Sequence, residues 1–417
     1  MTGLTWGVLY LVFSLLFFRA ILGPKNACLA YIFAVIPSEQ FMTVTYAPWG
    51  YGEIMASCAA TLWLAALWRR EGAFWQRLCF GLSVGLGIWF SFETLMIALP
   101  AIAWIAVGRR TAVLEESIPA VFGAMVGAIP FLGGNVGRGF PSLTRNWASR
   151  PASGLPQIWD NCVWLLTYML PKLLFRSSGW WSETTLLIGA YAVAGVGFVF
   201  AVRGNRSTDP RSYTTRDVAL LLLFVFVACV SIFSLSEAGS NRGWTVRYIA
   251  PFYVVVPLFL GVGVSSVWKW SKLLSVATVA ALLLPNVVLY GLPGSKLRAD
   301  LTAQLRSQMR LRQTLASQDV RMVYGDYFWV YGLNFDSLER IAGVPTVPMV
   351  DYLSYGDRLG TSKVRWAALG GKDEVQRWAQ ELRARGTLAK AGDLWLFIAA
   401  TPAPNAQSLI ASLRKSP

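Results

Sequence analysis

Long stretches without a charged residue constrain the fold of this chain more than any other feature. Seven such stretches lack Asp, Glu, Lys and Arg, except that the second contains Glu93: Met1–Phe18, Leu78–Gly108, Ile118–Gly137, Thr184–Val202, Val218–Ser236, Tyr248–Trp268 and Leu273–Ser295. A membrane-spanning helix needs about 20 apolar residues, and most of these stretches are long enough. Leu78–Gly108 is too long for one span, so we expect two short helices that turn at residues 91–94. With the shorter stretches Ala27–Ser38 and Ile54–Trp68, the sequence predicts about ten spans.

The composition supports a membrane protein. Only 14% of the 417 residues are charged and 55% are hydrophobic, whereas soluble domains have about a quarter charged residues. The 19 Trp, 15 Tyr and 23 Phe residues suit a chain that meets two membrane interfaces. The net charge of +15 belongs to loops and the C-terminal tail, so we expect no nucleic-acid partner.

Arg and Lys residues collect in alternate loops, which predicts the orientation because short cytoplasmic loops are rich in them. The cytoplasmic side is marked by Arg19 and Lys25, Arg69, Arg70 and Arg77, Arg109 and Arg110, Arg203, Arg206, Arg211 and Arg216, and Lys269 and Lys272. The intervening loops 39–53 and 91–94 contain neither residue type. This places the N-terminus, the loop 138–183 and the tail outside, in the periplasm if the membrane is a bacterial inner membrane. The loop 138–183 is itself basic, although long loops follow the rule less strictly.

The hydrophobic pattern changes after Ser295. Leu297–Ala316 is a basic amphipathic segment that either lies along the membrane surface or docks on the following domain. Strands are expected at Val320–Tyr324, Lys363–Leu369 and Leu394–Ala399, with a helix at Asp373–Arg385. The expected fold class is therefore an all-α polytopic membrane bundle, residues 1–295, followed by a small C-terminal α/β domain, residues 296–417.

The residue inventory limits the chemistry. The chain has no His, and its five Cys residues show no CxxC spacing, which excludes His-based triads and His-ligated zinc sites. Any acid, base or metal ligand must be Asp, Glu, Lys or Tyr. Glu53 and Glu93 are the candidate catalytic carboxylates. The alternatives are a solvated carboxylate at a helix start for Glu53 and the tip of a helical hairpin for Glu93.

Several local sequences together resemble the glycosyltransferase C superfamily of multi-spanning membrane enzymes. They are Tyr51-Gly52-Glu53 at the start of a span, paired Arg residues at cytoplasmic turns, Arg247-Tyr248-Ile249-Ala250-Pro251 at a late span, and, in the tail, residues 324–329 (YGDYFW) and 335–340 (FDSLER). The resemblance implies sugar transfer from a polyprenyl-phosphate carrier at the external face. It also makes Arg247 and Arg242, just outside the span from Tyr248, candidates for binding the lipid phosphate. The alternative for both is an interfacial anchor.

The chain departs from the superfamily pattern at its N-terminus. Members of the superfamily begin with one span and a large first external loop that carries the catalytic Asp or Glu, whereas no residue before Glu39 is acidic here. We therefore expect either a chain that lacks this first segment or an inactive paralogue, and no transfer by this polypeptide alone. The donor sugar, the acceptor and a requirement for a divalent metal stay open. A transporter or lipid flippase, disfavoured by the scarcity of charged residues in the spans, and a non-catalytic membrane scaffold are the alternative functions.

Overall fold

The structure is a computed structural model that describes residues 2–36, 51–109, 113–136, 154–170, 181–204, 213–235, 251–291, 296–325, 330, 341–345, 365–381, 385–391 and 394–400. The chain divides into two compact units, Met1–Val288 and Leu289–Pro417. Each unit is described by itself below.

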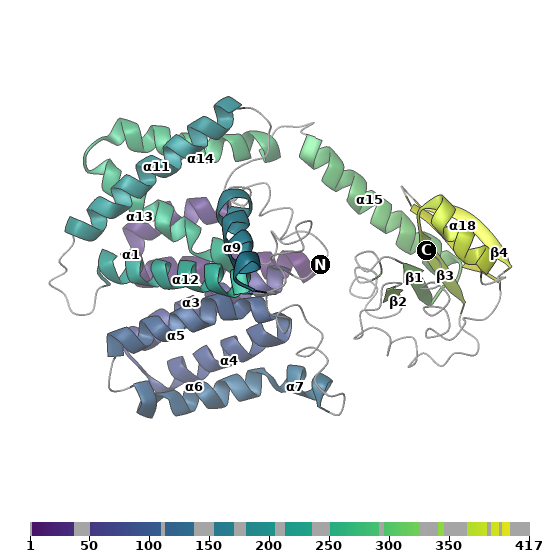
Figure 1. Cartoon of the computed structure of the whole chain (residues 1–417), viewed down its shortest axis with the longest axis horizontal. Helices are drawn as coiled ribbons and strands as arrows, with labels where there is room; N and C mark the ends of the chain where they lie inside the picture. Colours follow the sequence, from purple (N-terminus) through teal and green to yellow (C-terminus); the bar gives the residue numbers. More distant parts are fainter. Residues whose placement is uncertain are drawn as a thin grey trace. The chain divides into compact units, whose positions relative to one another are not determined.

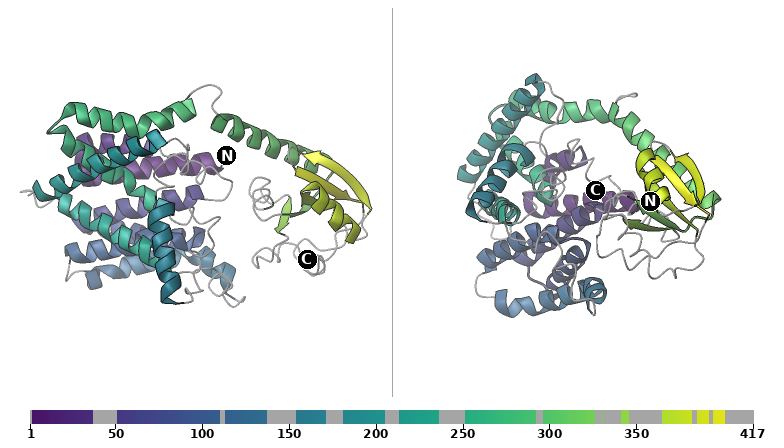
Figure 2. Two further views of the ribbon diagram at one scale, coloured as in Figure 1. Left: turned by 45° about the horizontal axis from the view of Figure 1, so that its top comes forward. Right: turned by 45° about the vertical axis from the view of Figure 1, so that its right-hand side comes forward.

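Helices that mostly lie side by side form the first unit (Figures 1 and 2). They are α1 (Thr2–Val35), α3 (Tyr51–Arg70), α4 (Phe74–Phe90), α5 (Leu95–Arg109), α6 (Val113–Gly127), α7 (Ile129–Asn135), α9 (Leu155–Trp164), α11 (Trp181–Gly204), α12 (Thr215–Leu235), α13 (Val256–Trp268) and α14 (Lys272–Gly291). The short α9 runs across the direction of its neighbours (Figure 1). A single turn, Phe92–Thr94, separates α4 from α5, which confirms the predicted break in Leu78–Gly108.

The chain reverses direction within α1. Gly23 adopts φ 73° and ψ 170°, a conformation that glycine tolerates, and Pro24 follows it. Tyr10 and Tyr31 lie close enough to interact electrostatically. In a continuous helix they would be about 31 Å apart, so the two parts of α1 fold back on each other. Residues 1–35 therefore supply two helices, as the sequence predicted.

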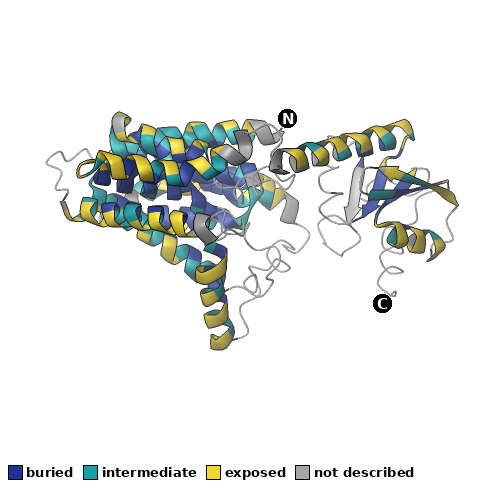
Figure 3. Cartoon of the chain, turned by 90° about the horizontal axis from the view of Figure 1, so that it is seen from above, coloured by how far each residue is buried: buried dark blue, intermediate teal, exposed yellow. Residues whose placement is uncertain are grey.

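Within the part of the chain that the structure describes, five helices are long and apolar enough to cross a membrane: Thr5–Pro24, Phe92–Arg109, Thr185–Arg203, Thr215–Leu235 and Pro251–Trp268. Three apolar helices among the same residues are shorter: Asn26–Val35, Glu116–Gly127 and Lys272–Val287. Exposed side chains alternate with buried ones around the outer helices (Figure 3). On α6 the exposed side chains include Ile118, Phe122 and Met125, of which Ile118 is 72% exposed. Such an apolar outer surface suits contact with lipid.

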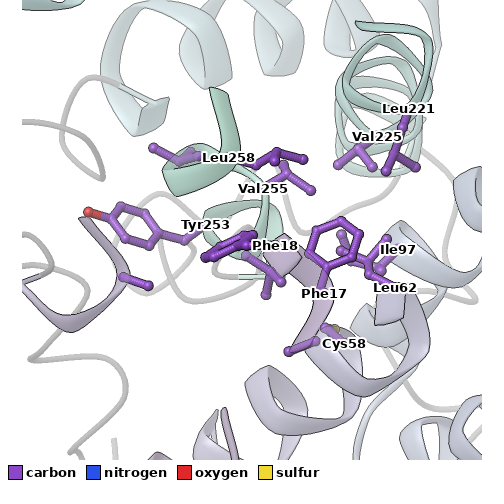
Figure 4. Packing of buried hydrophobic residues seen from close by; sticks show 14 of the residues in the cluster. Phe17, Phe18, Cys58, Leu62, Ile97, Leu221, Val225, Tyr253, Val255 and Leu258 are labelled. Carbon is purple, nitrogen blue, oxygen red and sulfur yellow. The ribbon is translucent and has the colours of Figure 1, made fainter. Parts of the chain in front are cut away.

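The core of the first unit lies where α1, α3, α5, α12 and α13 meet. Phe17 and Phe18 of α1 are fully buried and point toward Leu62 of α3 and Val255 before α13 (Figure 4). The close-up also places Leu221 and Val225 of α12 and Ile97 of α5 around them (Figure 4). Because every one of these contacts joins helices distant in sequence, this cluster fixes the bundle.

Small residues bring the backbones of neighbouring helices together. A Cβ atom added to Gly85 of α4 would lie 2.2 Å from the carbonyl oxygen of Ala124 in α6, and one on Gly123 would lie 2.1 Å from that of Leu78. The same contact recurs where Gly263 of α13 meets Ala194 of α11, at 2.1 Å. The glycines in these helices therefore mark close packing of neighbouring backbones.

The second unit contains helix α15 (Lys296–Ser317) and a five-stranded sheet. The strands are β1 (Met322–Gly325), β2 (Ala342–Pro345), β3 (Trp366–Gly370), β4 (Gly386–Ala391) and β5 (Leu394–Ala399), in the order β2-β1-β3-β5-β4. The first three strands of that order are parallel and the β3-β5-β4 pairings are antiparallel. Helix α18 (Lys372–Glu381) connects β3 to β4. The expected strands near residues 320, 366 and 394 are present, whereas β2 and β4 were not predicted.

Candidate functional site

One end of the helical bundle carries ion pairs, and we call it the basic end. Arg69, in the last turn of α3, pairs with Asp217 in the first turn of α12. Arg69 also donates to the carbonyl oxygen of Trp104 in α5 at 2.9 Å, and its guanidinium lies 4.3 Å from the centre of the Trp104 ring. The Trp104 indole donates to the Asp217 carbonyl oxygen at 2.8 Å. Three helices are thus joined through one arginine.

Tyr213, which lies just before α12, contacts both α5 and α3. Its ring stacks on Trp104 with centroids 5.2 Å apart, and its hydroxyl donates to the carbonyl oxygen of Ala66 in α3. Burial raises the pKa of the Tyr213 phenol above its ordinary value, so the hydroxyl keeps its proton as a donor. Thr214 caps α12: its hydroxyl donates to the Asp217 carboxylate at 2.7 Å and accepts from the Asp217 backbone N–H at 3.2 Å.

A second cluster at the basic end joins α3, α5 and α6. Glu116 of α6 accepts from the Trp68 indole at 3.1 Å and pairs with Arg109 of α5 at 3.3 Å. Arg109 also donates to the Trp68 carbonyl oxygen at 2.7 Å. Asp217, Glu116 and the Glu71 carboxylate, which pairs with Arg70, are all engaged by arginine. Asp217 and Glu116 therefore join neighbouring helices of the bundle, and all three carboxylates are poor candidates for chemistry.

The opposite end of the bundle is the end at which α3 begins and α4 and α12 end. Helix α4 begins at Phe74 and ends at Phe90, roughly 25 Å along its axis. There Phe90 meets Trp6 of α1, with ring centroids 5.3 Å apart. Asn161 of α9 donates to the Ser234 carbonyl oxygen at 3.2 Å, at the end of α12. Glu53 and Glu93 belong to this opposite end, because α3 begins and α4 ends there.

Glu93 is buried inside a polar cluster at the opposite end. The residue is 3% exposed and lies close to Cys58 of α3. The neighbouring Thr94 donates to the Gly87 carbonyl oxygen at 3.1 Å. Hydroxyl groups continue the cluster between α3 and α4, where Ser57 donates to the Ser83 carbonyl oxygen at 3.1 Å. The cluster attaches the turn 92–94 to both helices, so Glu93 lies at the tip of a helical hairpin and also faces the bundle interior.

Glu53 occupies a different position from Glu93. It lies in the first turn of α3 and is half-buried. A carboxylate there interacts favourably with the helix dipole. Ser57, one turn further on, shares its face of α3, so Glu53 stands at the mouth of the polar cluster that encloses Glu93. Of the two carboxylates, Glu53 is the more exposed.

A tyrosine-lined cavity lies at the opposite end between α1, α11, α13 and α14. Tyr191, Tyr253 and Asn286 supply its polar groups, and the remaining lining residues are apolar, including Phe33 and Pro257. The cavity holds about 20 Å³, room for one or two water molecules but too little for a sugar or an isoprenoid chain. These polar residues were not predicted as site residues, although Tyr and Asn within apolar stretches were the available signal.

Two predicted site residues lie outside the described residues: Arg242 and Arg247. Both precede Pro251, where the described part of the late span begins. Tyr253, which lines the cavity, follows Pro251 by two residues. Among the described residues, no group of three or more Asp, Glu or Cys residues is placed to hold a metal ion. The opposite end therefore combines a half-buried carboxylate, a buried carboxylate and aromatic hydroxyl groups.

These features define a multi-pass helical membrane protein. No family model and no curated protein matches the chain. Its fold is similar to that of ArnT from Cupriavidus metallidurans bound to undecaprenyl phosphate, with a TM-score of 0.53 and 14% identity over 96% of this chain and 84% of that chain. The apo state of the same ArnT gives a TM-score of 0.52 and 14% identity over 98% of this chain and 83% of that chain.

Proposed function

We propose that this protein is a membrane glycosyltransferase of the type that uses polyprenyl-phosphate-linked sugars. The observation that carries the proposal is the shared fold along nearly the whole chain with ArnT, one structure of which holds undecaprenyl phosphate. The superfamily resemblance of the local sequences points to the same class. The opposite end of the bundle, with Glu53 at its mouth, is the proposed ligand face.

The proposed topology has ten spans, two from α1 and one each from α3, α4, α5, α6, α11, α12, α13 and α14. The basic end is cytoplasmic, because its arginines mark the positive-inside side of the membrane. The opposite end, the N-terminus and the C-terminal domain then face the periplasm of a bacterial inner membrane. This arrangement places Glu53 on the side where a polyprenyl-linked sugar would be presented.

Cysteine labelling tests this orientation. In a variant with the five native cysteines replaced, Ser408→Cys should react with a membrane-impermeant maleimide in intact spheroplasts. Ser207→Cys, in the loop between α11 and α12, should react only after lysis, because that loop is basic and proposed to be cytoplasmic. Labelling of both positions in intact spheroplasts, or of neither, would contradict the orientation.

We further propose that Arg247 and Arg242 bind the phosphate of the lipid carrier. The guanidinium group can form two parallel hydrogen bonds with one phosphate, which an ammonium group cannot. In the sequence Arg247 lies next to the late apolar span, at the depth expected of a lipid phosphate. No metal is required for this contact, although a divalent ion at the sugar phosphate would be compatible with a carboxylate at Glu53.

Arg247→Lys should weaken polyprenyl-phosphate binding by about tenfold to a hundredfold, because one charge-assisted contact contributes about 1.5–3 kcal/mol. Binding to the purified chain in detergent can be measured by tryptophan fluorescence or by native mass spectrometry. Arg70→Lys is the matched control, since Arg70 lies at the basic end and pairs there with Glu71. Equal affinity of the wild type and Arg247→Lys would remove Arg247 from the site.

The other candidate functions are less well supported. A transporter or flippase, or a non-catalytic scaffold, would not account for the similarity to ArnT. Two acidic residues of the described spanning helices, Asp217 and Glu116, are held in ion pairs with arginine at the basic end. Polyprenyl-phosphate binding in the absence of any sugar transfer would favour a non-catalytic relative with the same fold.

A further inference from the structure

The basic helix α15 presents two different faces. Leu311 and Leu315 are buried in the core of the second unit with Val323 and Ile398, so this side of the helix docks on the sheet. Arg306, Met309 and Arg310 are exposed, and Met309 is 59% exposed. At about 100° per residue, these three lie at least roughly 100° around the helix from Leu311. Docking on the domain therefore leaves a cationic face uncovered.

The charged residues of α15 are mostly cationic. The helix contains five cationic residues, Lys296, Arg298, Arg306, Arg310 and Arg312, and one acidic residue, Asp300, a net charge of +4. The exposed Met309 between two exposed arginines gives the uncovered face an apolar contact as well. Cationic side chains beside an apolar residue are typical of helices that lie on anionic lipid headgroups.

The chain connectivity keeps the start of α15 close to the membrane. Helix α14, an apolar helix whose last turns lie at the opposite end of the bundle, ends at Gly291, and α15 begins at Lys296. Five extended residue steps span at most about 18 Å, whatever the arrangement of the two units. The start of α15 is thus held within about 18 Å of the end of α14, and Arg306 lies roughly 15 Å further along the helix, so the bilayer around α14 is within reach of the uncovered face.

We propose that the uncovered face of α15, with Arg306, Met309 and Arg310, binds the anionic phospholipid headgroups of the bilayer. The sequence left two alternatives for this helix, binding to the membrane surface or docking on the following domain. The face with Leu311 and Leu315 docks on the sheet, and the uncovered face binds the membrane. Binding fixes the C-terminal unit at the membrane surface. The proposal does not depend on the proposed transferase activity.

A fluorescent label can report on this contact. Met309→Cys, in the full chain with the native cysteines replaced, is labelled with an environment-sensitive dye and reconstituted in nanodiscs. In nanodiscs containing anionic phosphatidylglycerol, the dye should be protected from the neutral quencher acrylamide, and high salt should remove the protection. In nanodiscs of neutral phosphatidylcholine it should stay accessible.

Removing two cations should weaken the contact measurably. Each cation near an anionic surface favours the bound state by about fivefold, so Arg306→Gln/Arg310→Gln should shift the equilibrium about twenty-five-fold toward the unbound helix. The matched control is Arg377→Gln/Lys390→Gln, which removes two exposed cations from α18 and β4. Equal quenching in neutral and anionic nanodiscs, or equal protection of the two double variants, would overturn the proposal. Near-ultraviolet circular dichroism verifies that the sheet remains folded.

Discussion

Asp217→Ala should lower the free energy of unfolding of the helical unit by about 3–5 kcal/mol, because it leaves the Arg69 guanidinium largely buried without its carboxylate. The Arg69 side chain is 11% exposed and cannot turn to solvent without releasing Trp104. The substitution also removes the acceptor for Thr214 at the start of α12. Contacts between α3, α5 and α12 should therefore weaken together. Reversible unfolding in mixed micelles measures the change.

Two matched variants separate the ion pair from other effects. Thr214→Ala removes only the helix cap and should cost about 1 kcal/mol. Glu71→Ala breaks the more exposed pair with Arg70, whose side chains are 33% and 49% exposed, and should cost less than about 1 kcal/mol. If Asp217→Ala costs no more than Thr214→Ala, the Arg69–Asp217 pair does not stabilise the basic end.

The membrane helices were predictable because each is encoded locally. Absence of charge over a sufficient length is a property of the segment itself, so the break at Phe92–Thr94 and the two helices of α1 could be expected from the sequence. The short strands β2 and β4 were not predicted. Their sequences, AGVP and GTLAKA, contain Gly and Ala and little of the β-branched or aromatic character that marks a strand. Pairing with β1 and β5 determines them instead.

The site was less predictable than the fold. Charge alternation indicated that Arg69 and Arg109 share one side of the membrane, but not that Arg69 pairs with Asp217, 148 residues away. The tyrosine-lined cavity brings Tyr191, Tyr253 and Asn286 together from three helices, so no local pattern marks it. The positions of Glu53 and Glu93 were recognised as candidates. The sequence could not show how they differ in burial: Glu53 is half-buried at the mouth of the polar cluster, whereas Glu93 is enclosed by its hydroxyl groups.

The difference in burial between Glu53 and Glu93 leads to a prediction about which carboxylate takes part in sugar transfer. In sugar transfer a carboxylate acts as general base on the acceptor or positions a metal at the donor phosphate, and general acid–base catalysis contributes about 10²–10⁴-fold to the rate. Glu53→Gln keeps the size and polarity of the side chain but loses the charge. The sequence predicted no transfer by this polypeptide alone. If transfer from a polyprenyl-phosphate-linked sugar is nevertheless measured, Glu53→Gln should lower it at least about a hundredfold, while the thermal stability stays unchanged because Glu53 is only half-buried.

Glu93→Gln is the matched control for this experiment. Its carboxylate is 3% exposed beside Cys58 and the Ser57 hydroxyl cluster, so its loss should alter stability more than transfer. Each variant is purified in the same detergent, and its transfer is compared with its affinity for polyprenyl phosphate. Loss of transfer in Glu93→Gln alone would move the chemistry into the bundle interior. A wild-type chain that binds the lipid but transfers no sugar would instead identify a binding protein with an ArnT-like fold, because the ligand face would then lack a functional base.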